Sequence, residues 1–237
     1  MSAARYVAVD GLRGVAVVLM VIYHFMFDLD YFGRVEIDFN NDPVWLGFRA
    51  LIVSLFLGLV GVSLHLATRH GIDRAAFGRR LALLIFNAAL VSIGSYMIFP
   101  DSMIYFGILH FIAVASVLGL LLTGFYWLNL VLGSGLVLAG MFLQHPFFDH
   151  PMLHWVGLMT HKPVTEDYVP LVPWFGVVLL GMFLGRHFFA GGRPPSFLRW
   201  PGESPAMRAL TLMGRHSLLI YMLHQPILIG AMFLLWG

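Results

Sequence analysis

Long apolar stretches dominate the chain, and short segments rich in charged residues, glycine and proline separate them. About 20 consecutive apolar residues can cross a bilayer as an α-helix, so this pattern predicts a helical membrane protein. The apolar stretches cover residues 8–30, 45–67, 81–99, 104–123, 126–144, 169–189 and 209–235. The predicted fold class is therefore all-α, a polytopic bundle of about seven transmembrane helices that forms a single domain over residues 1–237.

The basic residues indicate how the bundle is oriented. The chain is 59% hydrophobic and only 11% charged, and just three of its 14 Lys and Arg residues, Arg34, Arg49 and Lys162, fall on the side opposite the N-terminus. By the positive-inside rule, the N-terminus is cytoplasmic and the C-terminus, after an odd number of spans, is outside. We expect the cytoplasmic arginines to face membrane lipid or an anionic ligand, and no nucleic acid.

The first apolar stretch carries ionisable side chains where a membrane helix rarely holds them. Four of them fall on one face of a helix: Asp10, Arg13, His24 and Asp28. Arg13 and His24 differ by about 20° around the helix axis and by about 16 Å along it. Ionisable groups inside a bilayer are costly unless they face protein or water, so these residues are candidates for function. A helix cap and a snorkelling arginine are the alternative explanation for Asp10 and Arg13.

Two further spans place polar groups at membrane depth. His110 lies in the fourth span, and His224 lies beside Gln225 in the last. If the first, fourth and last spans are neighbours, then His24, His110 and His224 face one polar cavity in the outer half of the bilayer. Hydrogen bonding between helices is the alternative, purely structural explanation for His110 and His224.

The sequence predicts no metal site. The outer segment 145–168 is rich in histidine, and His150 and His154 have a spacing that a helix could use to bind zinc. Pro146 and Pro151 argue against a regular helix there. The chain contains no cysteine, which excludes a thiolate nucleophile and a thiolate metal site.

Small residues recur in the second and sixth spans at spacings that let helix backbones approach closely: Gly58, Gly61, Gly181 and Gly185. Such spacings serve packing inside a bundle or the seam of a homodimer. Internal packing is the favoured interpretation, and a homodimer is the alternative.

Several motifs resemble those of known families. VDGLRGVAVVLMVIYHF, at residues 9–25, resembles the opening of the transmembrane acyltransferase superfamily, in which an arginine and a histidine eleven residues apart serve acyl transfer from acyl-CoA. Together with LFLGLVGVSL, GILHFIAVAS, VPWFGVVLLGMFLG and GRHSLLIYMLHQPIL, it more closely resembles the heparan-α-glucosaminide N-acetyltransferase catalytic-domain family in its short bacterial form. The resemblance covers nearly the whole chain. It implies a multi-pass protein of the bacterial inner (plasma) membrane that carries acetyl from cytosolic acetyl-CoA to an amine across the membrane.

One position departs from that family. Its lysosomal member has asparagine where this chain has His24, and its proposed catalytic histidine lies eleven residues later, at the position of Val35 here. The loop histidine therefore does not carry over. We expect His24 itself to act as the base or as a transient acyl carrier, as in the wider superfamily.

The predicted roles follow the order of the residues across the membrane. Asp10 and Arg13 organise the phosphates of acetyl-CoA, because a guanidinium binds phosphate bidentately. His24, oriented by Asp28, accepts a proton or carries the acetyl group. The acceptor is an amino sugar or other glycan outside. Its side of the site is lined by the remaining polar residues, His110, His224 and Gln225.

Two other classes of protein compete with the enzyme. A proton-coupled transporter would use the intramembrane His and Asp residues as a proton relay. The odd number of spans and the single polar stripe argue against a duplicated transporter. A non-catalytic scaffold would use the same residues only to fix helix packing, and the cost of burying so many titratable groups argues against it.

Overall fold

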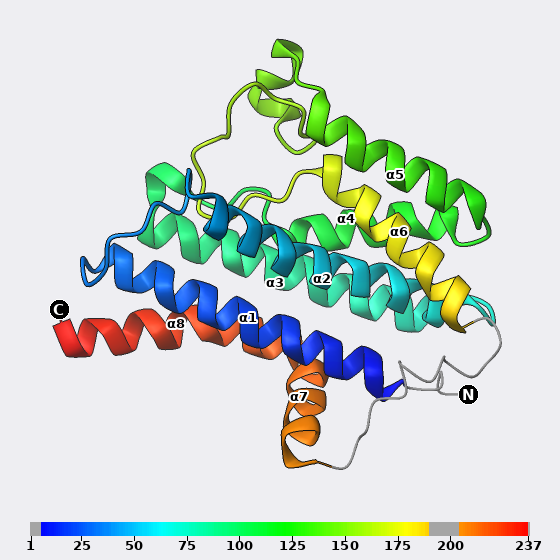
Figure 1. The fold of residues 1–237 in the computed structure, drawn as a ribbon, viewed down its shortest axis with the longest axis horizontal. Coiled ribbons are helices and arrows are strands. Elements are labelled where there is room, and N and C mark those ends of the chain that lie inside the picture. Colours follow the sequence, from blue (N-terminus) through cyan, green and yellow to red (C-terminus); the bar gives the residue numbers. More distant parts are fainter. Residues whose placement is uncertain (1–5, 190–203, 237) are drawn as a thin grey trace. The chain divides into compact units, whose positions relative to one another are not determined.

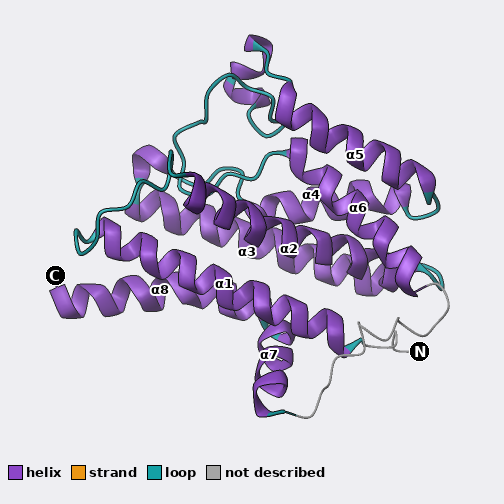
Figure 2. Cartoon of the chain, in the orientation of Figure 1, coloured by secondary structure: helices purple, strands orange, loops and turns teal. Residues whose placement is uncertain are grey.

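The computed structural model describes residues 6–189 and 204–236. In these ranges the chain forms α-helices and short 3-10 helices joined by loops, without β-strands (Figure 1 and Figure 2). The α-helices are α1 (Val7–Tyr31), α2 (Pro43–Thr68), α3 (Arg74–Ile98), α4 (Ile108–Leu122), α5 (Trp127–Phe142), α6 (Leu171–Phe189), α7 (Pro205–Arg215) and α8 (Ser217–Trp236). The 3-10 helices are η1 (Pro100–Ser102), η2 (Pro146–Asp149) and η3 (Pro151–Leu153). The predicted all-α class is confirmed.

The long apolar helices identify a multi-pass membrane protein. In the described part of the chain, α1, α2, α3, α6 and α8 are long and apolar enough to cross a bilayer. α4 and α5 are apolar but shorter, with 15 and 16 residues. Length and composition thus identify five of the expected spans.

The stretch 209–235, expected as one span, forms two helices. α7 ends at Arg215, where the backbone N–H of His216 bonds to two carbonyls of the last turn, and α8 begins at Ser217. α7 is amphipathic and carries Arg208 and Arg215, whereas α8 is apolar, so the expected span merged part of an amphipathic helix with a membrane-spanning one. A tertiary contact at Gly214, described below, fixes where α7 lies.

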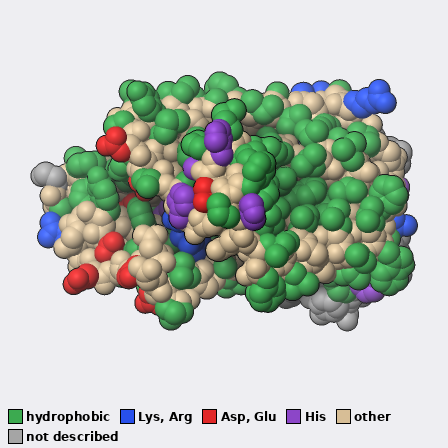
Figure 3. All heavy atoms as spheres, turned by 90° about the horizontal axis from the view of Figure 1, so that it is seen from above, with side chains coloured by type: hydrophobic (Ala, Val, Ile, Leu, Met, Phe, Trp, Pro, Cys, Tyr) green, Lys and Arg blue, Asp and Glu red, His purple; other side chains and the backbone are tan. Residues whose placement is uncertain are grey.

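Apolar side chains on the surface match a lipid environment. On α3 the side chains of Leu83, Ile85, Phe86 and Ile93 are 51–61% exposed. Figure 3 shows such hydrophobic side chains spread over one face of the molecule. Soluble proteins rarely expose contiguous apolar surface on this scale, whereas a bilayer covers it.

The helices form two compact units. The first unit comprises Met1–Phe56 and Pro194–Gly237, and the second comprises Leu57–Arg193. α1, α7 and α8 belong to the first unit, and α3 to α6 belong to the second. α2 passes from the first unit into the second after Phe56.

In the first unit, α1 and α8 run parallel and side by side (Figure 1). Arg215, just before α8, contacts Asp10 near the start of α1. Near the far ends of both helices, the rings of Phe32 and Phe233 lie 5.1 Å apart between centroids. An aromatic core around Tyr23 packs the middle of α1 against the first half of α2. Residues that are about 200 positions apart in the sequence therefore share one helix interface.

Close backbone contact joins α2 to α6 in the second unit. A Cβ on Gly61 would fall on the carbonyl of Val178, and a Cβ on Gly181 would fall on the carbonyl of Gly58. Only glycine permits this approach, so internal packing of these small residues is confirmed. A homodimer stays a prediction.

Candidate functional site

Three charged side chains meet where α1 begins and α7 ends. Asp10, in the first turn of α1, is 5% exposed. Nη1 of Arg13 lies 3.1 Å from its Oδ1, and Nε of Arg215 lies 3.3 Å from its Oδ2. One carboxylate thus lies between two guanidiniums, and the three groups together carry one positive charge in excess. We call Asp10, Arg13 and Arg215 the charge cluster.

Two glycines bring α7 against α1 and so place the third member of this cluster. A Cβ on Gly14 would fall on the carbonyl of Leu210, and a Cβ on Gly214 would fall on the carbonyl of Asp10. Sequence reasoning counted Arg215 only as one of the cytoplasmic basic residues. The signal that could have found it is the Gly-Arg pair that opens GRHSLLIYMLHQPIL.

Farther along α1 and α8, two histidines form a pair. The ring centroids of His24 and His224 lie 4.8 Å apart, with 66° between the ring planes. Nδ1 of His24 lies 2.9 Å from the carbonyl of Met20, and Nδ1 of His224 lies 2.7 Å from the carbonyl of Tyr221. A carbonyl only accepts, so Nδ1 carries the proton in both neutral rings and Nε2 carries the lone pair. The structure thus brings two of the predicted site histidines together.

Buried polar atoms surround this pair. Nε2 of Gln225 donates to Oδ1 of Asp28 over 3.2 Å, and Asp28 is only 2% exposed. Within the described residues, three buried atoms here lack a hydrogen-bond partner: Asp28 Oδ2, His224 Nε2 and Gln225 Oε1. Each of these atoms is an acceptor. Because buried polar atoms are nearly always hydrogen-bonded, this group is suited to a ligand that brings donors.

The structure gives Asp28 a different contact from the expected one. We expected it to orient the ring of His24 from one turn farther along the helix. Within the described residues, Asp28 accepts from Gln225, and the Met20 carbonyl, one turn before His24, holds the His24 ring instead. Spacing alone places both groups within reach of the ring, so it could not distinguish between them.

His110 lies in the second unit, where its ring makes hydrogen bonds that connect α3 with the start of α4. Its Nδ1 accepts the backbone N–H of Gly107 at 3.3 Å, and its Nε2 lies 3.2 Å from Oγ of Ser92. Ser92 in turn donates to the carbonyl of Ile104. These contacts match the structural explanation of this histidine. They lie within one unit, and a place for His110 on the acceptor side stays a prediction.

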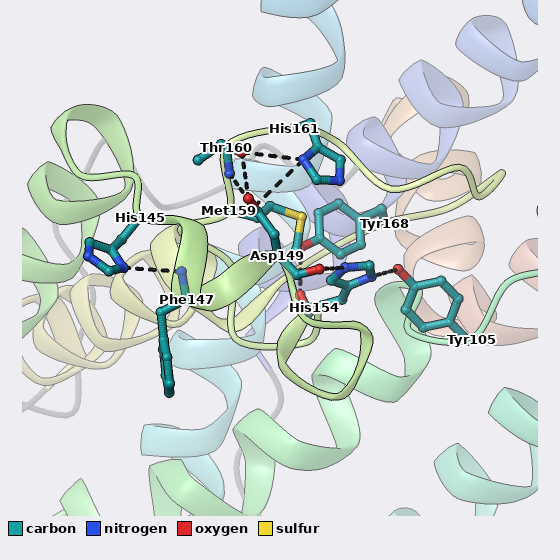
Figure 4. Close-up of polar contacts among 9 residues, drawn as sticks. All are labelled: Tyr105, His145, Phe147, Asp149, His154, Met159, Thr160, His161 and Tyr168. Carbon is teal, nitrogen blue, oxygen red and sulfur yellow. Dashed lines mark hydrogen bonds and ion pairs between the residues drawn. The ribbon is translucent and has the colours of Figure 1, made fainter.

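The histidine-rich loop between α5 and α6 is held by bonds within the protein. Pro146 and Pro151 begin the separate turns η2 and η3, so no regular helix joins the histidines, as expected. Figure 4 shows His154 between Tyr105, which donates to Nδ1 at 3.1 Å, and the carbonyl of Asp149, 3.0 Å from Nε2. Figure 3 shows histidine side chains around an acidic one. No group of three His, Asp or Glu residues in the described ranges is placed to hold a metal ion.

Asp149 makes the bonds that close this loop. Its Oδ1 accepts the backbone N–H of Thr160 at 2.8 Å, its Oδ2 accepts the Thr160 hydroxyl at 2.7 Å, and Nδ1 of His161 lies 3.7 Å away (Figure 4). The bonds from Thr160 lower the pKa of the Asp149 carboxyl. Such a group contributes stability above its unfolded pKa, and this contribution is lost as the pH falls through the folded pKa.

We therefore expect the loop to open at acidic pH. Protection of the Thr160 amide against hydrogen exchange should be constant above about pH 5 and should fall once the pH drops below the ordinary aspartate pKa of about 3.9. Hydrogen–deuterium exchange of the purified protein, followed by mass spectrometry, measures this protection. Asp149→Asn, which cannot titrate, is the control. Equal acid sensitivity in this variant would contradict the prediction.

Comparison with known proteins agrees with the resemblance seen in the sequence. A family model described as heparan-alpha-glucosaminide N-acetyltransferase, catalytic, matches residues 5–226. Curated protein sequences and solved structures give no significant match. The matched range includes the charge cluster, the histidine pair and Gln225. The chain belongs to the catalytic family of heparan-α-glucosaminide N-acetyltransferase, a family of membrane acetyltransferases.

Proposed function

We propose that this protein transfers an acetyl group from cytoplasmic acetyl-CoA to an amino sugar or other glycan on the outer side of a bacterial inner (plasma) membrane. The observation that carries the proposal is the arrangement on α1 and α8. The charge cluster lies at one end, and the His24–His224 pair lies about 16 Å farther along α1, beside three unsatisfied acceptors. Family membership supports the reaction class.

The direction of the helices supports a cytoplasmic N-terminus and an outer C-terminus. α1 and α8 run parallel, so both cross the membrane in the same direction. An odd number of membrane crossings must then lie between them, which makes the total number odd. If α2 to α6 each cross once, the protein has seven transmembrane helices in contact with membrane lipid. α7 then stays on the side where α1 begins, which agrees with its contact with Asp10. The basic residues favour the cytoplasm for that side.

The charge cluster is suited to the phosphates of acetyl-CoA. Guanidinium groups bind phosphate oxygens through paired N–H donors. Asp10 fixes the positions of Arg13 and Arg215 but offsets only one of their two charges. The excess positive charge therefore favours an anionic ligand at this end of α1.

Two routes lead from the thioester to the product, and Nε2 of His24 serves both. In direct transfer, Nε2 takes the proton from the acceptor as its nitrogen or oxygen attacks the thioester carbonyl carbon. The carbon–sulfur bond breaks, and the leaving thiolate takes the proton back from the imidazolium. In the other route, Nε2 attacks the thioester carbon itself, CoA leaves, and the acceptor then takes the acetyl group from the ring.

The unsatisfied acceptors favour an amine as the group that is acetylated. An amino sugar brings N–H and O–H donors, which Asp28 Oδ2, His224 Nε2 and Gln225 Oε1 can accept. An amine in this position would lie next to the Nε2 atoms of the histidine pair. His110 stays a further candidate for contact with the acceptor.

Arg13→Ala and Arg215→Ala are each expected to weaken acetyl-CoA binding about tenfold or more, because each removes a charged hydrogen-bond donor to phosphate. Isothermal titration calorimetry of the detergent-purified protein measures the dissociation constant for acetyl-CoA. Arg79→Ala removes the same charge from the exposed start of α3 and should bind as the wild type does.

Absence of acetyl-CoA binding to well-folded wild-type protein would contradict the proposed function. Proteoliposomes then test the competing class, because a proton-coupled transporter would show a pH-dependent solute flux that needs no acetyl-CoA.

A further inference from the structure

A second basic site lies in the second unit, where α2, α4 and α6 end. A pocket of about 470 Å³ is lined by His65, Thr68, Arg69, His70, Thr123, Gly124 and Arg186. Arg69 and Arg186 bring two positive charges, and none of these lining residues is acidic. The proposed acetyl transfer assigns nothing to this pocket, which we call the arginine pocket.

Backbone carbonyls hold both guanidiniums in place. Nη1 of Arg69 donates to the carbonyl of Phe189 at 3.2 Å, and Nη1 of Arg186 donates to the carbonyl of Gly124 at 3.1 Å. The guanidinium carbon of Arg186 also lies 5.4 Å from the centre of the Tyr126 ring. A carbonyl accepts from a guanidinium and an aromatic face packs on it, and both contacts orient the group. Both positive charges are thus positioned before any ligand arrives.

A buried imidazole completes the lining. His65, in the last turn of α2, is 8% exposed and lines the pocket together with Arg69 and Arg186. An imidazole N–H in this lining can donate to a ligand oxygen. His65 thus adds a third possible donor to those of the two arginines.

We propose that the arginine pocket binds a phosphate group. Two oriented guanidiniums and an imidazole N–H offer several donors to phosphate oxygens, and the lining holds no carboxylate to compete with the ligand. The phosphate comes from a lipid headgroup or from a soluble phosphorylated molecule such as the acyl donor. The site stands whether or not the chain transfers acetyl groups, because it shares no residue with the charge cluster or the histidine pair.

Gly124 offers a matched pair of variants. A Cβ at Gly124 would meet no atom within 4 Å, so Gly124→Asp and Gly124→Asn both fit without disturbing the fold. The aspartate adds a carboxylate beside Arg186, whereas the asparagine has the same shape and no charge. We expect calorimetry with inorganic pyrophosphate to show binding about tenfold weaker or worse for Gly124→Asp, and unchanged for Gly124→Asn. Equal affinity of the two variants would overturn the proposal.

Two further measurements identify the source of the phosphate. If it is a lipid, native mass spectrometry should show phosphatidylglycerol retained by Gly124→Asn and lost from Gly124→Asp. If it is the acyl donor, acetyl-CoA affinity should fall in Gly124→Asp alone. If pyrophosphate distinguishes the variants but neither lipid retention nor acetyl-CoA affinity does, the phosphate belongs to another soluble molecule. In every case His24 and its acetyl transfer are unaffected.

Discussion

Replacing His24 by asparagine is expected to lower kcat for acetyl transfer by about 10²–10⁴-fold, the usual contribution of a general base. The asparagine amide can still donate to the Met20 carbonyl in place of Nδ1–H, so the local hydrogen bond survives. It has no basic lone pair to replace Nε2. Acetyl-CoA affinity should stay within about twofold, because the charge cluster lies about 16 Å away. Transfer of labelled acetyl to glucosamine by reconstituted protein measures kcat.

His187→Asn is the control, because it makes the same exchange at an exposed position on α6 and should keep full activity. An undiminished kcat in His24→Asn would contradict the assignment. The substitution also gives this position the asparagine that the lysosomal family member has. An active His24→Asn variant would therefore mean that the general base of both proteins is a residue at another position. His224→Asn would then be the next variant to measure.

Gly214→Leu is expected to separate α7 from α1 and to destabilise the protein by about 3 kcal/mol, the upper end of typical overpacking costs. A Cβ at this position would fall on the carbonyl of Asp10, a backbone atom that cannot move without bending α1. Arg215 would lose its contact with Asp10, so acetyl-CoA binding should weaken as well. Thermal unfolding of the detergent-purified protein and calorimetry measure the two effects.

Gly230→Leu provides the matched control on the neighbouring helix. A Cβ at Gly230, on α8, would meet no atom within 4 Å, so this variant should unfold at a temperature equal to or above that of the wild type. Similar losses of stability in the two variants would show that leucine is poorly tolerated in these helices generally. The close contact between α7 and α1 would then not be the cause.

Much of the fold follows from the apolar pattern, because a chain that crosses the bilayer must form its backbone hydrogen bonds within its own helix. The expected stretches 8–30, 45–67 and 169–189 agree with α1, α2 and α6 to within two residues at each end. The break at His216 was missed because the expected span counted Leu210, Leu212 and Met213 as its apolar start. The change from an amphipathic helix to an apolar one at this point was the signal in the sequence that marks the break.

The candidate site was predictable where its members share one helix. Helical periodicity grouped Asp10, Arg13 and His24, and the structure keeps them on α1. Partners from other helices were harder to find, because pairing across about 200 residues depends on tertiary packing. Arg215 was therefore missed. The grouping of His110 with His24 stays a prediction, because the contacts of His110 lie within the second unit.

The parallel pairing of α1 with α8 has a consequence for biosynthesis. His24 and Asp28 are translated early, whereas His224 and Gln225 are translated about 200 residues later, which takes roughly 10–40 s at typical rates of elongation. Until then α1 must enter the membrane without the contacts that α8 makes to His24 and Asp28, and ionisable groups that lack such contacts are costly in lipid. Insertion of α8 thus assembles the histidine pair as one of the last steps in making the protein, and a nascent chain that lacks α8 has no site for premature chemistry.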